Sequence, residues 1–232
     1  MKRERLLITV LYVLLLAGGL WHALGIFQTA MRILATPMIA GICLLLCYEY
    51  LKTQPERLRV NEAVQSAPAE RGAERRKFLQ WSAAILLCSF LLEVAGVKSG
   101  VIFGSYAYGD TLQPQLWNVP VAIGCAWLSM LLSSAALAQK LWPDARPLAQ
   151  SVVIALLMVL FDAFMEPAAM KLGYWHWSAA KIPVRNFIAW LVFGLILSHW
   201  GARWHIFTRR VSTVPVHAYF AQVGYFMIVN VS

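Results

Sequence analysis

Seven long runs of mostly apolar residues dominate this chain, and each is long enough to cross a bilayer as a helix. They lie at about 6–26, 31–51, 78–97, 119–141, 149–169, 186–204 and 215–231. Only 13% of the residues are charged, whereas soluble domains carry roughly 25%. We therefore expect an all-α fold, a polytopic transmembrane helix bundle of about seven spans, in which residues 1–232 form a single integral membrane domain.

The positive charges between the runs predict the orientation of the bundle. Fifteen of the 20 Lys and Arg residues fall in segments that would share a side with the N-terminus. Because Lys and Arg are enriched in cytoplasmic connections, we expect a cytoplasmic N-terminus in a cell inner membrane. The first run is too long for a cleaved signal peptide, so we expect it to be retained as a span. The net charge of +9 arises from these connections, and we do not expect nucleic-acid binding.

The segment 53–77 is the one stretch that looks like a linker. It mixes Arg, Glu, Ala, Pro and Gln without hydrophobic periodicity. Such a composition does not bury enough apolar surface to pack against the bundle. We expect a mobile cytoplasmic loop or a frayed surface helix, whose charges contact water and anionic lipid.

Three carboxyl groups lie inside the apolar runs near the side opposite the N-terminus. Glu93 is near the outer end of the third run, and Asp162 and Glu166 are one helical turn apart in the fifth. An isolated acid of this kind could pair with Lys171, Arg185 or a helix terminus. Three acids at similar depth favour a functional site, because ionisable groups there are costly and normally face the bundle interior. Burial and like-charge proximity favour the neutral acid, so one of them is a candidate proton donor.

The two outer loops are rich in aromatic residues. Two pairs share a two-residue spacing, namely Tyr106 with Tyr108 and Trp175 with Trp177. Interfacial aromatics often form only an anchoring belt, but this spacing, with Gly and Pro nearby, suits short extended segments that cap the bundle. In the sixth run, one helical stripe holds Asn186, Trp190 and Gly194.

Several cofactor motifs are absent from the sequence. There is no G-x-G-x-x-G dinucleotide motif, and the five histidines form no H-x-x-H or H-x-x-x-H cluster. The last run contains no Lys that could form a retinal Schiff base. The four cysteines form no C-x-x-C pair, so neither a disulfide framework nor a zinc site is indicated. We expect acid–base chemistry without a cofactor or a metal.

One ordered set of motifs resembles a known family, the membrane carotenoid biosynthesis proteins. These include the CruF-type carotenoid 1,2-hydratases and the archaeal bisanhydrobacterioruberin hydratases. The resemblance covers about 90–200. The motifs are Glu93-x-x-Gly96-x-x-x-Gly100-x-x-x-Gly104-x-Tyr106-x-Tyr108, Val119-Pro120 with Trp127, Asp162-x-x-x-Glu166-Pro167, Gly173-x-Trp175-x-Trp177 and Ile182-Pro183-x-x-Asn186-Phe187-x-x-Trp190.

The resemblance implies cofactor-free addition of water across the terminal C1=C2 double bond of an acyclic carotenoid end group. Protonating this alkene gives a tertiary carbocation, so the site needs a positioned acid, aromatic faces and a path for water. We assign Asp162 or Glu166 as the proton donor, and Glu93 as its partner or as the group that activates water. The expected substrate-binding residues are Tyr106, Tyr108, Trp127, Trp175, Trp177, Asn186 and Trp190.

The expected partners are an acyclic carotenoid, membrane lipids and other enzymes of the same pathway. Two other functions remain open. A carotenoid or isoprenoid cyclase would use the same protonation but close a ring, giving an isomer instead of a product heavier by one water. A non-enzymatic lipid-binding protein or proton-coupled transporter would use the acids as a proton relay, although the sequence shows no inverted repeat.

Overall fold

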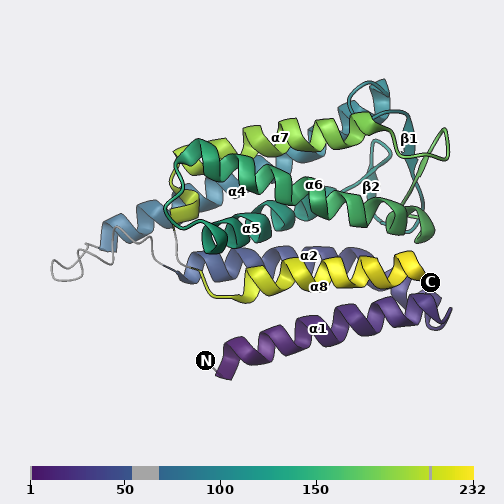
Figure 1. Cartoon of the computed structure of the whole chain (residues 1–232), viewed down its shortest axis with the longest axis horizontal. Helices are drawn as coiled ribbons and strands as arrows, with labels where there is room; N and C mark the ends of the chain where they lie inside the picture. Colours follow the sequence, from purple (N-terminus) through teal and green to yellow (C-terminus); the bar gives the residue numbers. More distant parts are fainter. Residues whose placement is uncertain (1, 54–67, 209–210) are drawn as a thin grey trace.

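The structure, a computed structural model, describes residues 2–53, 68–208 and 211–232. Within these ranges seven long helices run side by side as a bundle (Figure 1). They are α1 (Lys2–Ala23), α2 (Gln28–Lys52), α4 (Pro68–Ser99), α5 (Ile123–Leu141), α6 (Pro147–Lys171), α7 (Val184–Arg203) and α8 (Val214–Val231). One short 3-10 turn, η1 (Ile206–Thr208), joins α7 to the segment before α8. The prediction of an all-α helical bundle is confirmed.

Each helix contains most of one predicted apolar run. Six of the described helices are long and apolar enough to cross a membrane. The exception is α5, which carries Ser129, Ser133 and Ser134 and is buried along nearly its whole length. A helix that is surrounded by other helices has little contact with lipid. It therefore needs less apolar surface than its neighbours.

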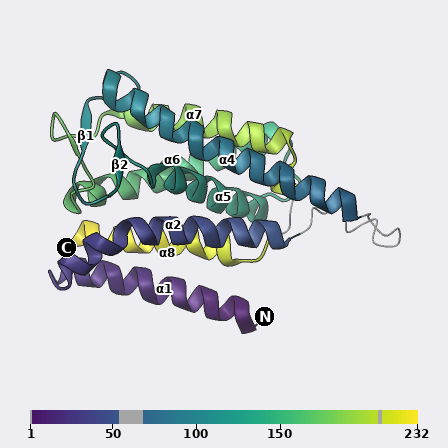
Figure 2. The same cartoon turned by 180° about the vertical axis from the view of Figure 1, so that it is seen from behind.

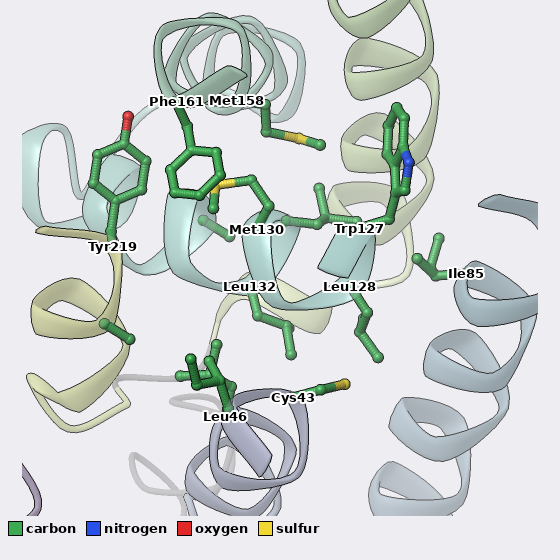
Figure 3. Packing of buried hydrophobic residues seen from close by; sticks show 14 of the residues in the cluster. Cys43, Leu46, Ile85, Trp127, Leu128, Met130, Leu132, Met158, Phe161 and Tyr219 are labelled. Atoms are coloured by element: carbon green, nitrogen blue, oxygen red, sulfur yellow. The ribbon is translucent and has the colours of Figure 1, made fainter. Parts of the chain in front are cut away.

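Helix α5 forms the centre of the bundle and packs against α2, α4, α6 and α8. Figure 3 shows its side chains Trp127, Leu128, Met130 and Leu132 directed toward the surrounding helices. The side chains that meet them include Cys43 and Leu46 on α2, Ile85 on α4, and Met158 and Phe161 on α6, all buried. The core of the bundle is therefore built around one helix.

Two predicted boundaries differ from the structure. Residues 54–67 of the predicted loop 53–77 lie outside the described residues, and the chain is helical from Pro68 onward. An alternating Ala, Glu and Arg composition supports helix well beyond the apolar part of α4. The predicted fourth run begins at 119, but Val119 and Pro120 form a strand and α5 starts at Ile123.

Short strands cap one end of the bundle. Strand β1 (Tyr106–Tyr108) pairs antiparallel with β4 (Trp175–Trp177), and β2 (Gln115–Leu116) pairs with β3 (Val119–Pro120). The β2–β3 turn consists of Trp117 and Asn118, both at positive φ, as a tight primed hairpin turn requires. The prediction of short extended segments is confirmed.

The two termini lie at opposite ends of the bundle (Figure 1). The strands share their end with the C-terminus, while the N-terminus lies at the other end. A chain with an odd number of spans has its two termini on opposite sides of the membrane. The positive-inside rule predicts that the strand-capped end faces away from the cytoplasm.

Candidate active site

The three intramembrane carboxyl groups lie at the strand-capped end of the bundle. Glu93 is in the last two turns of α4, Glu166 is in the last two turns of α6, and Asp162 is one turn earlier. All three side chains are buried. The three acids therefore lie at the same end of the bundle.

Glu93 accepts three hydrogen bonds from the loop and from α5. The Tyr106 hydroxyl donates to Oε2 at 2.5 Å, and the Tyr108 hydroxyl donates to the same oxygen at 2.9 Å. The Trp127 indole N–H donates to Oε1 at 2.9 Å. Both oxygens of this buried carboxyl are therefore satisfied, as buried polar groups require.

Glu166 and Asp162 form a second cluster, which is held together by one amide. The indole N–H groups of Trp175 and Trp177 donate to Glu166 Oε2 at 2.9 and 2.8 Å. Asn186 Nδ2 donates to Glu166 Oε1 at 3.1 Å and to Asp162 Oδ2 at 2.7 Å. Asp162 Oδ1 is buried and has no hydrogen-bond partner among the described residues. The two acids thus share a donor within an apolar interior.

Strand pairing explains why four aromatic donors reach these acids. Tyr106 lies opposite Trp177, and Tyr108 lies opposite Trp175. Alternate residues of a strand point to the same face, so all four rings face the bundle interior while the residues between them, Ala107 and His176, are exposed. The two-residue spacing in the sequence therefore places two phenols and two indoles beside two carboxyl groups.

Aromatic rings also line the space between the acids. The Trp127 and Trp190 rings stack with centroids 4.0 Å apart and planes inclined by 9°, which joins α5 to α7. The Tyr106 and Trp177 rings have centroids 5.0 Å apart. Such rings present electron-rich faces to a cation.

A cavity of about 180 Å³ connects these groups. Every predicted site residue except Asp162 lines it, so Asp162 reaches the cavity only through Asn186. The sequence did not identify the other lining residues, most of which come from α1, α2, α5 and α8. Phe103 in the loop after α4 and Phe161 on α6 also line the cavity. An apolar side chain that lines a cavity has the same sequence pattern as one that faces the core or lipid.

Lys171 and Arg185 do not neutralise the acids. Lys171 Nζ donates to the carbonyl groups of Val229, Asn230 and Ser232 at the end of α8. The Arg185 guanidinium donates to the carbonyl of Val101 at 3.1 Å. Among the described residues, Lys52 forms an ion pair with Glu49, and both of these residues are on α2. The alternative in which the acids pair structurally with Lys171 or Arg185 is therefore wrong.

Tyr106 and Tyr108 remain protonated donors. Both lie in the loop that caps the bundle, and burial raises the pKa of each phenol well above its ordinary value, with a further contribution from the adjacent Glu93 carboxyl. A neutral phenol donates its proton to a carboxyl oxygen, whereas a phenolate would repel it. The hydrogen bonds to Glu93 therefore persist well into the alkaline range.

These raised pKa values predict an alkaline loss of stability. In the unfolded chain a tyrosine ionises at about pH 10. The stability that a buried, protonated tyrosine gives to the fold is therefore complete below that pH and is lost as the pH rises above it. Each such group contributes a slope of about 1.4 kcal/mol per pH unit there. The melting temperature in detergent should fall less steeply with rising pH for Tyr106→Phe than for the wild-type chain. Equal slopes would contradict the buried, protonated state of Tyr106.

Comparisons with known proteins identify the family of this chain. A family model described as "Carotenoid biosynthesis protein" matches residues 58–232. A curated relative, "Bisanhydrobacterioruberin hydratase" of Haloarcula japonica, is 27% identical over 122 residues, which cover 49% of this chain and 41% of the relative. The chain thus matches less than half the length of that relative, and no solved structure matches. Because the family model covers well over half of the chain and includes every site residue described above, the chain belongs to the carotenoid biosynthesis protein family.

Proposed function

We propose that this protein hydrates acyclic carotenoids by adding water across the terminal C1=C2 double bond of an end group. The observation that supports this most strongly is the position of Glu166. Its carboxyl lines a largely apolar cavity, shares the Asn186 amide with Asp162, and lies among aromatic rings. A proton donor beside aromatic faces suits an alkene that reacts through a carbocation.

The proposed reaction needs one proton transfer in each direction. The Glu166 carboxyl gives its proton to C2, and the electron pair of the double bond forms the new C–H bond, which leaves a tertiary cation at C1. In this proposal the rings of Tyr106 and Trp177, of which Trp177 bonds to Glu166, stabilise the cation. Water then bonds to C1 and releases one proton, so the sum is alkene plus water giving a tertiary alcohol.

The second carboxyl cluster has a separate role in this proposal. Glu93 lines the same cavity, and its two oxygens accept hydrogen bonds from Tyr106, Tyr108 and Trp127. We assign it the orientation of the attacking water and the acceptance of the released proton. Before the next turnover, the proton that Glu93 has accepted returns to Glu166 through water in the cavity. Asp162 positions the Asn186 amide, which also bonds to Glu166.

Pigment analysis tests the function directly. We expect cells that make an acyclic carotenoid, and that express this chain, to accumulate a pigment heavier by one water per reacted end group. In water labelled with heavy oxygen the label should enter the pigment, because the oxygen comes from water and not from molecular oxygen. A new pigment of unchanged mass would indicate ring closure, and unchanged pigments would contradict an enzymatic role.

A further inference from the structure

The cavity extends away from the acids into a part of the chain that precedes the family match. The match begins at residue 58, whereas α1 and α2 occupy 2–52. Apolar residues of both helices line the cavity, among them Leu14 and Trp21 on α1 and Leu34, Ala35 and Met38 on α2. The acid site therefore has an apolar limb that these two helices form.

Three of these residues show where the limb reaches the surface. Leu14, Trp21 and Leu34 line the cavity and yet are 47%, 38% and 49% exposed. A side chain with both properties lies at the mouth of a cavity. The mouth is therefore between α1 and α2.

Helix packing explains why the bundle is open at this place. Helix α1 packs along α8 and much less against α2. Gly19 brings α1 close to α8, since a Cβ at this position would lie 3.2 Å from the Ile228 side chain and 3.3 Å from the Tyr225 carbonyl oxygen. Figure 2 shows α1 at the edge of the molecule, beside α2 and α8.

The mouth opens at a depth where the surroundings are lipid chains. At 1.5 Å per residue, Leu14 lies roughly 13 Å from the end of α1, and Leu34 lies roughly 9 Å from the start of α2. Both helices are long and apolar enough to cross the membrane. A ligand that passes this mouth therefore comes from the bilayer interior and not from water.

We propose that the gap between α1 and α2 is a lateral portal, through which the end of an extended isoprenoid chain passes from the bilayer to the acid site. This inference rests on the proposed function and adds where the substrate enters and which helices hold its chain. The cavity of about 180 Å³ is smaller than the roughly 300–1,000 Å³ of pockets that enclose a drug-sized ligand. It holds an end group and a short stretch of polyene, while the remaining chain stays in lipid.

Neighbouring residues on each helix provide a matched test. Leu14→Trp with Leu34→Trp would fill the mouth, and both side chains have lipid beside them, which limits the effect on folding. Val13→Trp with Ile33→Trp places the same residues one position away, at side chains that are 60% and 68% exposed and do not line the cavity. Each pair adds two indole rings to the same two helices.

Measuring the hydration of two substrates distinguishes an effect on the portal from an effect on the acid site. The substrates are an acyclic carotenoid in lipid nanodiscs and a short, water-dispersible terpenoid with the same end group. We expect Leu14→Trp with Leu34→Trp, the mouth pair, to lower carotenoid hydration about tenfold or more. The mouth pair should hydrate the short substrate within about twofold of wild type, and Val13→Trp with Ile33→Trp, the control pair, should hydrate both substrates within about twofold of wild type. Equal conversion by the two pairs would overturn the portal, and so would an equal loss for both substrates.

Pigment binding distinguishes failure of the portal from failure of the proposed function. If the wild-type chain hydrates neither substrate, the proposed function is wrong, and the portal is judged by the carotenoid that co-purifies with each variant. Less pigment with the mouth pair than with the control pair supports the portal. Equal amounts overturn it.

Discussion

Replacing Glu166 with glutamine is expected to lower hydration by about 10²–10⁴-fold, the usual contribution of a positioned general acid. The substitution keeps the size of the side chain and leaves an amide oxygen that can still accept from Trp175 and Trp177. It removes the transferable proton and places an amide N–H₂ against the Asn186 donor. The measurement is the amount of hydrated pigment per unit of folded protein.

A buried glutamate outside the site provides the matched control. Glu49 is fully buried, but it lies near the end of α2 on the far side of the bundle, where Lys52 and Ser212 bond to its carboxyl. It does not line the cavity. Glu49→Gln should therefore retain hydration, unlike Glu166→Gln. Hydration that persists in Glu166→Gln but disappears in Asp162→Asn would instead make Asp162 the proton donor.

Gly124→Ala should lower stability by about 1–3 kcal/mol, the usual effect of adding atoms to a packed interior. A Cβ at Gly124 would lie 2.6 Å from the carbonyl oxygen of Leu86 and 3.3 Å from its Cα. These are backbone atoms that cannot rotate away, so α4 and α5 must separate. Trp127 follows one turn later on α5 and donates to Glu93 on α4, so hydration should fall as well. Thermal denaturation and pigment analysis check the two effects.

A glycine-to-alanine substitution at Gly41 should not lower stability as Gly124→Ala does. Gly41 lies inside α2, and a Cβ there would meet nothing within 4 Å. Alanine in a helix interior is favoured over glycine by about 0.5–1 kcal/mol. Gly41→Ala should therefore be neutral or slightly stabilising. A similar loss of stability at both positions would show that the close approach of α4 and α5 is not the cause.

The helices and the polar part of the site could be predicted from the sequence. Apolar runs of span length dictate helices, because a backbone in lipid must satisfy its hydrogen bonds internally. Glu93, Asp162 and Glu166 were identifiable because a carboxyl group in such a run is costly and needs partners. The alternation of Tyr106 and Tyr108, and of Trp175 and Trp177, indicated extended segments with one shared face.

Tertiary structure alone decided the arrangement of these parts. No spacing in the sequence showed that the Asn186 amide bridges Asp162 and Glu166, or that α5 lies at the centre of the bundle. The sequence also did not indicate the apolar limb of the cavity between α1 and α2. In a membrane, core and lipid are equally apolar, so the sequence of a helix does not reveal which of its faces meets lipid, protein or a cavity.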